Sequence, residues 1–313
     1  MFYLPEFEDI AVRFCSPYDD HFYQRWCREA YDALLRHEHC TQDPERGTWS
    51  VAPATLRCVS FAEVDWSALA AHVTGLAART GGKRVLVFDG SDIPHPRLGG
   101  PPMIVCKSAW HRSFYSPDTS ISIPQFPRFS WEREPMPASA RKFLAGFKGD
   151  PRPECHTLRT RLLSLDNNRD FIVRAAALTP AHIKILPSGA ATEDPPPGEI
   201  SFVELMYNST FALLPRANGY ALSYRMIESM NAGCIPVILS DGYVLPFSEV
   251  LDYEPWSVRV AESDVDKLPD LLRERLPDAD RMQRDMLKVY HSCFSSTERI
   301  IRKTLEIAER MVH

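Results

Sequence analysis

The stretch from Asn208 to Tyr253 reads NSTFALLPRANGYALSYRMIESMNAGCIPVILSDGYVLPFSEVLDY. Its apolar run from Phe211 to Leu214 predicts a short buried strand, and a helix is predicted from Tyr224 to Asn231. Between the two, Gly219 allows the loop to approach a ligand closely. A strand, a glycine loop, a helix and a second strand in this order indicate an α/β fold.

The start of the predicted helix has the properties of an anion site. Ser223 is predicted as the N-cap, and the helix amides and dipole behind it present partial positive charge. Arg225 adds a full charge, and Glu228 on the same face has a carboxylate suited to the two hydroxyls of a ribose. These residues predict a nucleoside-diphosphate pocket. The alternative for Arg225 and Glu228 is an ordinary helix salt bridge that contributes about 0.2 to 0.5 kcal/mol.

Predicted strands and helices alternate along the rest of the chain, which implies parallel sheets with right-handed crossovers. Four prolines, at 124, 127, 135 and 137, predict a domain boundary. We therefore expect two Rossmann-like domains, at residues 1–138 and 139–294, followed by a helix at 295–313. The further strands are predicted at 11–15, 55–61, 84–88, 103–107, 119–123, 143–147, 171–175 and 257–260, and the further helices at 22–36, 66–80, 157–165 and 295–312.

Composition narrows the class of protein. A chain of 313 residues, 44% hydrophobic and 25% charged, is long enough for two domains with separate cores. The net charge of −5 and the absence of a dense Lys/Arg run argue against nucleic acid as a partner. No apolar run approaches the roughly 18 to 20 residues of a membrane span, and the first nine residues lack the features of a signal peptide. The sequence therefore predicts a soluble, cytoplasmic protein.

Cysteine and histidine usage does not indicate a metal site. The eight cysteines include no Cys-x-x-Cys pair and are predicted to be free thiols in a reducing compartment. The run from His37 to Cys40 lies at the polar end of an amphipathic helix without a second ligand cluster, so a solvated helix end is favoured over a metal site.

The motif resembles the exostosin-type glycosyltransferases of family 47. It has the strand-final proline, the glycine loop, the Ser-x-Arg-x-x-Glu helix, the Gly-Cys-x-Pro-Val strand and the Pro-Phe turn of that family. A weaker similarity lies upstream, in RKFLAGFKG at 141–149 and LRTRL at 158–162, so the resemblance covers about half the chain, from near 141 to 276. The matching positions are Pro215, Gly219, Ser223, Arg225, Glu228, Gly233, Cys234, Pro236, Val237, Pro246, Phe247, Leu251 and Asp252.

The chain departs from the family pattern in two places. Tyr224 occupies a position where many members have proline, and the loop after Pro215 is a residue or two longer than usual, so the resemblance implies the pocket but does not specify its loop contacts. The run DGYVLPFS at 241–248 resembles the plant cell-wall branch of the family, which favours xylose and then galactose as the donor sugar.

The resemblance implies the GT-B architecture, in which two Rossmann-like domains face each other across a cleft. It implies that residues 1–138 bind a glycan or oligosaccharide acceptor, that 139–294 bind a UDP-sugar, and that 295–313 pack back on the first domain. Expected donor-binding residues are Lys148, Gly149, Arg159, Arg216, Gly219, Ser223, Arg225, Glu228 and Tyr243. For Lys148 a solvated strand end remains an equal alternative, and the assignments of Arg159 and Arg216 depend on the motif match.

Inverting transfer needs a base for the acceptor hydroxyl. In a parallel sheet, functional groups follow the carboxyl ends of strands, and Asp20 is our candidate, with Asp19, Asp92 and His95 as rivals. The alternative for each is a helix cap or a turn. The Asp-x-Asp pairs at 264–266 and 278–280 match the spacing of a manganese motif, but both are predicted to open helices. We therefore expect no essential metal and no other cofactor.

Two functions follow from these residues. The first is an inverting glycosyltransferase that moves one sugar from UDP to a hydroxyl of a glycan. The second is a catalytically silent nucleotide-sugar- or glycan-binding subunit that partners another transferase, which the uncertain base leaves open.

Overall fold

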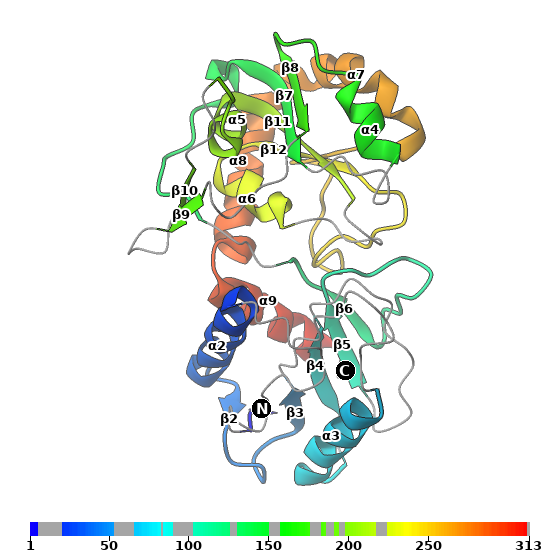
Figure 1. Ribbon diagram of the computed structural model, residues 1–313. Coiled ribbons are helices and arrows are strands. Elements are labelled where there is room, and N and C mark those ends of the chain that lie inside the picture. The colour runs from blue at the N-terminus through cyan, green and yellow to red at the C-terminus, as the bar shows by residue number, and fades with distance from the viewer. Residues whose placement is uncertain are drawn as a thin grey trace.

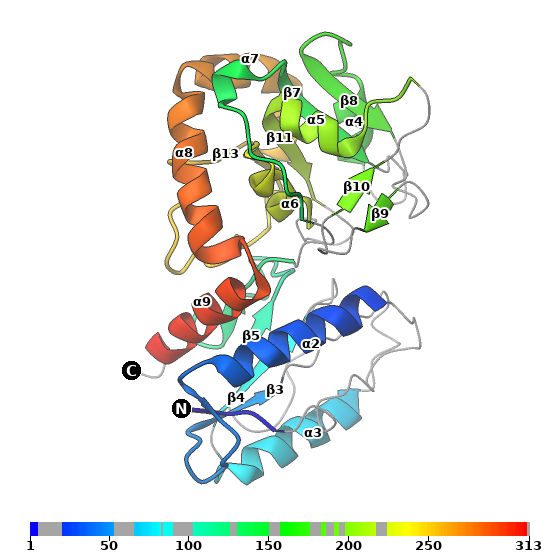
Figure 2. The same ribbon diagram turned by 90° about the vertical axis from the view of Figure 1, so that its left-hand side faces the viewer.

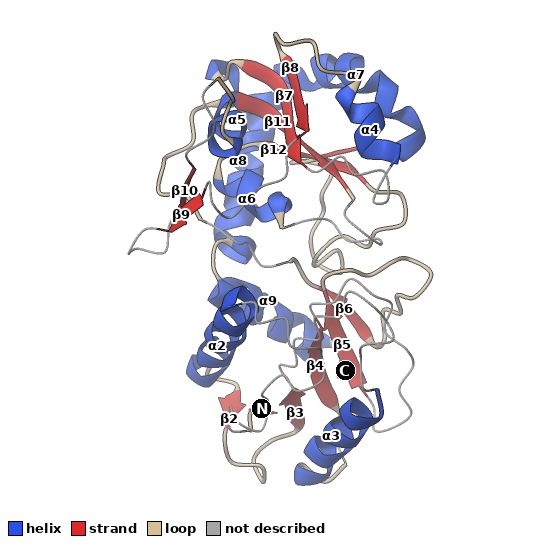
Figure 3. Cartoon of the chain, in the orientation of Figure 1, coloured by secondary structure: helices blue, strands red, loops and turns tan. Residues whose placement is uncertain are grey.

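The computed structural model describes residues 1–5, 21–52, 66–82, 84–89, 103–125, 130–149, 157–175, 183–185, 191–193, 198–216 and 224–311. Within these residues the chain forms two α/β domains, each built on its own parallel sheet (Figure 1). Helices lie against both sheets in layers (Figure 3). The predicted α/β class with two parallel-sheet domains is confirmed.

The first sheet has the strand order β2-β1-β3-β4-β5-β6, and all its neighbours pair in parallel. β1, β2 and β3 were not predicted; the first two have two residues each, too few for a periodic pattern. The predicted strands at 11–15 and 55–61 lie outside the described residues. The elements are β1 (Phe2–Tyr3), α2 (His21–Arg36), β2 (Cys40–Thr41), β3 (Trp49–Ala52), α3 (Trp66–Arg79), β4 (Val85–Asp89), β5 (Met103–Lys107) and β6 (Ser120–Ser122).

The second sheet has the order β13-β12-β11-β7-β8 and is also parallel. From β7 the chain moves to β8 on one side and later to β11 on the other, so the winding direction reverses between β7 and β11. Ligands of open α/β sheets bind at the carboxyl ends of strands beside such a reversal. The strands are β7 (Phe143–Gly149), β8 (Phe171–Ala175), β11 (Ser209–Pro215), β12 (Ile235–Leu239) and β13 (Val258–Arg259).

Helices cover this sheet, and a short hairpin lies beside it (Figure 1). In the hairpin, β9 (Ile183–Ile185) pairs antiparallel with β10 (Ala191–Glu193). The helices are α4 (Thr157–Leu163), α5 (Phe202–Asn208), α6 (Arg225–Asn231), α7 (Leu268–Arg275) and α8 (Ala279–Val289), and the short helical turns are η2 (Ala138–Ala140), η4 (Glu262–Lys267), η5 (Leu276–Asp278) and the π-helical η6 (Tyr290–Phe294).

The last helix, α9 (Thr297–Arg310), returns to the first domain. It follows α8 and η6 and lies beside α2 (Figure 2). The Thr297 hydroxyl donates to Glu29 Oε2 at 2.9 Å, and the Arg84 guanidinium donates to the Met311 carbonyl at 3.2 Å. The end of the chain therefore connects the second domain to the first.

One hydrophobic core continues from the first domain into the second. It joins Phe88 of β4 and Ile121 of β6 to Ile238 of β12, and the rings of Phe247 and Phe294 stack with centroids 5.6 Å apart. Because apolar burial contributes roughly 25 cal/mol per Å², this shared core stabilises one arrangement of the two domains.

Gly233, between α6 and β12, occupies a position that no other residue fits well. Its φ is +71°, and a Cβ there would lie 2.7 Å from Nη2 of the buried Arg141. The Arg141 guanidinium donates to the carbonyls of Met206, Ser209 and Ala232 at 2.7–3.0 Å. Burial lowers the pKa of Arg141 from its usual value. The glycine of the Gly-Cys motif therefore makes room for an arginine that satisfies buried carbonyls.

Candidate active site

The helix α6 begins at Arg225, one residue later than predicted. Tyr224 occupies the N-cap position with helical dihedral angles, φ −48° and ψ −15°, and its side chain makes no capping hydrogen bond. The prediction of Ser223 as the N-cap is therefore wrong, because the later start moves the cap by one residue. With seven residues α6 is short, so the charge of Arg225 is the main positive feature at its start.

Arg225 lies at the reversal of the second sheet. Its guanidinium donates to the Lys148 carbonyl near the end of β7, and its Cζ lies 5.4 Å from the ring centroid of Phe147 and 5.0 Å from that of Phe202. A Cβ on Gly149 would come within 2.6 Å of Arg225 Nη1. Gly149 therefore lets the guanidinium lie directly against the strand end.

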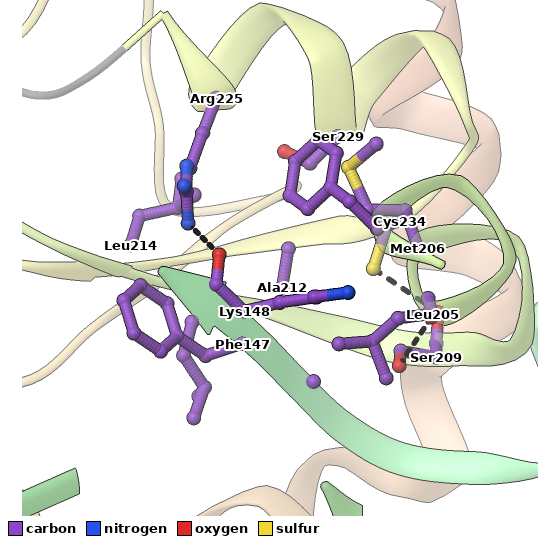
Figure 4. Close-up of a pocket in the computed structure, with 13 residues that line it drawn as sticks. Phe147, Lys148, Leu205, Met206, Ser209, Ala212, Leu214, Arg225, Ser229 and Cys234 are labelled. Atoms are coloured by element: carbon purple, nitrogen blue, oxygen red, sulfur yellow. Dashed lines mark hydrogen bonds between the residues drawn. The ribbon is translucent and has the colours of Figure 1, made fainter. Parts of the chain in front are cut away.

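Lys148 turns its charge away from that guanidinium. The side chain is buried and crosses a small cavity (Figure 4). Its ammonium donates to the Ile200 carbonyl at 2.9 Å and lies 3.5 Å from Glu199 Oε2. The cavity measures about 20 Å³, room for about one water molecule. The nucleoside diphosphate expected from the sequence is much larger than this cavity and does not fit in it.

A larger hollow, of about 400 Å³, borders Lys148 on the side of β8. Lys142, Arg169 and Arg174 line it together with one carboxylate, that of Glu199. Arg174 forms an ion pair with Asp166 and donates to Asn168 Oδ1 at 2.7 Å. Lys148 therefore lines both hollows, and its ammonium is bonded to two residues that line the larger one.

Arg159 and Arg216 meet at the same edge, one strand away. The Arg159 guanidinium donates to the Arg216 carbonyl at 3.3 Å, and Arg216 Nε donates to Glu262 Oε1 at 2.9 Å. Arg216 follows β11, the neighbour of β7. The structure thus places Arg159, Arg216 and Arg225 near the carboxyl ends of adjacent strands, where Glu262 offsets part of the charge.

The two remaining described candidates lie deeper. Glu228 in α6 is 1% exposed, and Tyr243 is 2% exposed. The Tyr243 hydroxyl donates to the Ser108 carbonyl of the first domain at 2.9 Å. Tyr243 therefore lies at the junction of the two domains. Its expected contact with the UDP-sugar stays a prediction. The other candidates, Asp19, Asp20, Asp92, His95, Gly219 and Ser223, lie outside the described residues.

A buried ion pair in the first domain was missed by the sequence reasoning. Lys107 Nζ lies 2.8 Å from Asp89 Oδ2, and both side chains are 0% exposed. Asp89 ends β4, which reads VLVFD, and Lys107 ends the adjacent strand β5, which reads MIVCK. Each apolar run therefore finishes on a charged residue. A charged residue at the end of each of two apolar runs was the sequence signal for this ion pair. It makes the carboxyl edge of the first sheet polar.

The domain junction is built by the segment that follows β12. Around the bridge pair His111 and Tyr243, the Arg112 amide donates to the Gly242 carbonyl at 2.8 Å and the Val244 amide donates to the Trp110 carbonyl at 2.9 Å. The carboxyl edge of the second sheet is therefore bonded to the loop after β5 of the first.

No group of three His, Cys, Asp or Glu side chains in the described residues is arranged to hold a metal ion. None of the helices that the structure describes is long and apolar enough to cross a bilayer. The Asp-x-Asp pairs at 264–266 and 278–280 lie in η4 and at the start of α8.

The two parallel-sheet α/β domains, with the final helix packed on the first, have the arrangement that the GT-B expectation describes. The family model of the exostosin GT47 domain matches residues 85–275. The chain belongs to the exostosin GT47 family.

Three animal relatives illustrate the extent of the similarity. The Exostosin-1 homolog of Caenorhabditis elegans is 38% identical over 91 residues, 28% of this chain and 24% of that protein. Exostosin-1 of Drosophila melanogaster is 32% identical over 176 residues, which are 53% of this chain and 22% of that protein. Exostosin-1c of Danio rerio is 30% identical over 227 residues, which are 67% of this chain and 30% of that protein. The chain therefore spans less than a third of the length of these relatives.

Two solved structures are similar to this chain at low sequence identity. AviGT4, a glycosyltransferase involved in avilamycin A biosynthesis, has a TM-score of 0.43 and 12% identity, and the match covers 99% of this chain and 97% of that one. TarM has a TM-score of 0.37 and 11% identity over 72% of this chain and 54% of that one.

Proposed function

We propose that this chain is an inverting glycosyltransferase that moves a sugar from a UDP-sugar to a hydroxyl of a glycan acceptor. The observation that carries the proposal is the exostosin GT47 match to residues 85–275, which includes β7, β11 and α6. Within that match, three arginines lie near the carboxyl ends of the central strands. Positive charge at this edge is what a departing diphosphate requires.

In the proposed reaction, the acceptor oxygen attacks the anomeric carbon as the bond to the diphosphate breaks, and the configuration inverts. Arg225, and behind it Arg159 and Arg216, would stabilise the charge that develops on the leaving UDP. Each charge-assisted hydrogen bond of this kind contributes about 1.5 to 3 kcal/mol. Glu228 is the proposed partner of the ribose hydroxyls.

The proposed base takes the proton of the acceptor hydroxyl. Asp20 is the first candidate, with Asp19, Asp92 and His95 as alternatives, because all of them follow first-domain strands in the predicted scheme. The proposed donor sugar is xylose and then galactose, on the basis of the DGYVLPFS run at 241–248. A soluble cytoplasmic location and metal independence complete the proposal.

The test is the release of UDP from a panel of UDP-sugars, with and without glycan acceptors and with EDTA present. We expect turnover with one donor, which survives EDTA and falls at least tenfold in Arg225→Ala. Arg273→Ala, a change at a half-exposed arginine of α7, is the matched control and should keep full activity.

The outcomes separate the two candidate functions. Donor binding without turnover for every acceptor would indicate a silent subunit. Absence of UDP and UDP-sugar binding would overturn the pocket assignment. Turnover lost in EDTA and restored by a divalent cation would overturn the metal-independent mechanism.

A further inference from the structure

The hollow of about 400 Å³ in the second domain lies beside β8, the edge strand of the sheet (Figure 1). Its volume is within the range of pockets that hold a small ligand. Its lining begins at Lys142, just before β7, and continues to Ala175 at the end of β8. The hollow therefore follows the length of both strands and is not confined to the carboxyl edge, where the arginines assigned to the donor lie.

The lining of this hollow is strongly basic. Of the described residues, one carboxylate lines it, that of Glu199, against four cationic side chains: Lys142, Lys148, Arg169 and Arg174. Lys148 and Arg174 are register partners on β7 and β8, so their backbones lie about 4.8 Å apart and their side chains leave the same face of the sheet. Like charges in this arrangement repel each other, and an anion between them would relieve that repulsion.

Two of the four cations have little neutralising charge from the protein. Lys142 makes no ion pair with a carboxylate of the described residues, and its ammonium lies 5.2 Å from the ring centroid of Phe143. Arg169 is 80% exposed, and its Nε lies 4.0 Å from Asp170 Oδ1, a long and solvated contact. Both residues precede the amino ends of their strands. Their charge is therefore available to a ligand at that end of the hollow.

The other two cations are fixed at the carboxyl end. Arg174 is ion-paired with Asp166 and donates to Asn168 Oδ1 at 2.7 Å, so its guanidinium is held in place. The ammonium of the buried Lys148 lies 3.5 Å from Glu199 Oε2, whose side chain is 55% exposed. A long contact to an exposed carboxylate contributes little. An incoming anion can therefore take the place of Glu199 at Lys148.

We propose that this hollow binds a small polyanion that carries a chain of phosphate groups. Lys142 and Arg169 hold one end of the chain, and Lys148 and Arg174 hold the other. Lys142 and Lys148 are six residues apart, roughly 20 Å of extended strand, so even with their side chains leaning together the cations match a row of charges rather than a single anion. The proposal does not depend on the transferase function.

The test is calorimetric titration of the full chain, saturated with UDP, at low salt and without divalent cations. UDP fills the proposed donor pocket, so further binding reports on the hollow. The probes are inorganic phosphate, pyrophosphate and tripolyphosphate. We expect affinity to rise roughly five- to tenfold with each added phosphate, the range for exposed but charge-assisted contacts.

A fourth probe, ATP, distinguishes two sources of the same chemistry. Binding at least as tight as that of tripolyphosphate would identify the ligand as a nucleoside triphosphate. Weaker binding would identify it as an inorganic phosphate chain.

Variants assign the binding to this hollow. Lys142→Gln and Arg169→Gln should each weaken tripolyphosphate binding roughly fivefold. Glu199→Gln should strengthen it roughly two- to fivefold, because it removes the carboxylate that competes for Lys148. Thermal unfolding of each variant verifies the fold.

Matched controls remove the same charges elsewhere and should change the affinity less than about twofold. They are Lys288→Gln at a lysine of α8 that is 76% exposed, Arg302→Gln at an arginine of α9 that is 47% exposed, and Glu254→Gln at an exposed glutamate.

The proposal is overturned if tripolyphosphate does not bind, or if the controls change its affinity as much as the variants do, which would indicate a general effect of net charge. UDP binding is measured separately. If UDP does not bind, the titrations are made without it; the donor pocket then fails, and the hollow stands on the responses of its own variants. If UDP binds and tripolyphosphate does not, the hollow alone fails.

Discussion

The Ser122 amide of β6 donates a 3.1 Å hydrogen bond to Glu249 Oε1 of the second domain. The Tyr115 hydroxyl donates to the same carboxylate oxygen. Burial, followed by this hydrogen bond, raises the pKa of Tyr115 above its usual value, so the phenol remains a donor at neutral pH. One carboxylate therefore receives two donors from the other domain.

Glu249→Ala is expected to lower the free energy of unfolding by about 1 to 2 kcal/mol, because both donors lose a charged acceptor that is partly exposed to water. Glu249→Gln should cost less, since its amide oxygen still accepts. Urea denaturation measures both changes. Glu254→Ala, an exposed neighbour, is the control; an equal loss in this variant would contradict the role of Glu249.

Lys107→Met is expected to cost about 3 to 5 kcal/mol, because it leaves the Asp89 carboxylate buried without its ammonium partner. The double variant Lys107→Met with Asp89→Asn should recover most of that loss, since no buried charge then remains. Lys288→Met, at a lysine that is 76% exposed, should cost less than about 0.5 kcal/mol. Similar losses in the two single variants would refute the buried-pair account.

Gly149→Ala is expected to displace the Arg225 guanidinium, because the new Cβ would lie 2.6 Å from Nη1 and 2.8 Å from Phe147 Cζ. Under the proposed function, UDP affinity should fall roughly tenfold, the equivalent of one charge-assisted bond. The free energy of unfolding should fall by about 1 to 3 kcal/mol. Calorimetry with UDP and urea denaturation measure the two effects.

Gly75→Ala provides the contrast, since the position is exposed in α3 and a Cβ there meets nothing within 4 Å. It should stabilise the protein by about 0.8 to 1 kcal/mol and leave UDP affinity unchanged. Unchanged UDP affinity in Gly149→Ala would show that Arg225 does not need its place against the strand end.

His37 is expected to make stability depend on pH. Burial, followed by the charges of His39 and Arg302, lowers its pKa from 6.5, and its Nδ1 accepts from the His39 amide at 3.2 Å. The unfolded chain therefore takes up the proton first, so the contribution is present above pH 6.5 and is lost as the pH falls below it.

The measurement compares wild type and His37→Gln by urea denaturation at pH 8 and pH 5.5, conditions on either side of the reference pKa of about 6.5. Wild type should lose more stability than the variant between the two. At pH 8 His37 is neutral in both the folded and the unfolded protein. The comparison of wild type with His37→Gln at pH 8 is therefore the internal control, because it contains no effect of protonation of His37. An equal loss in both proteins would exclude His37 as the source.

Local patterns were sufficient for most of the elements. The helices α2 and α3 and the strands β5, β7 and β8 were predicted within a few residues of their observed bounds, because their apolar runs and glycine stops act locally. Gly81 and Gly82 close α3 as predicted, with φ of +71° and +79°. The two-residue strands β1 and β2 have no such signal; their pairing with β3 makes them strands.

The sequence by itself determined the family and the α/β class, because the motif around Arg225 and the strand and helix periods are properties of consecutive residues. Only the tertiary structure decided which side chains meet. Lys148 bonds to Ile200, and Tyr243 bonds to Ser108 of the other domain. These partners are 52 and 135 residues apart in the chain, and sheet pairing and domain packing, which no local pattern encodes, bring them together.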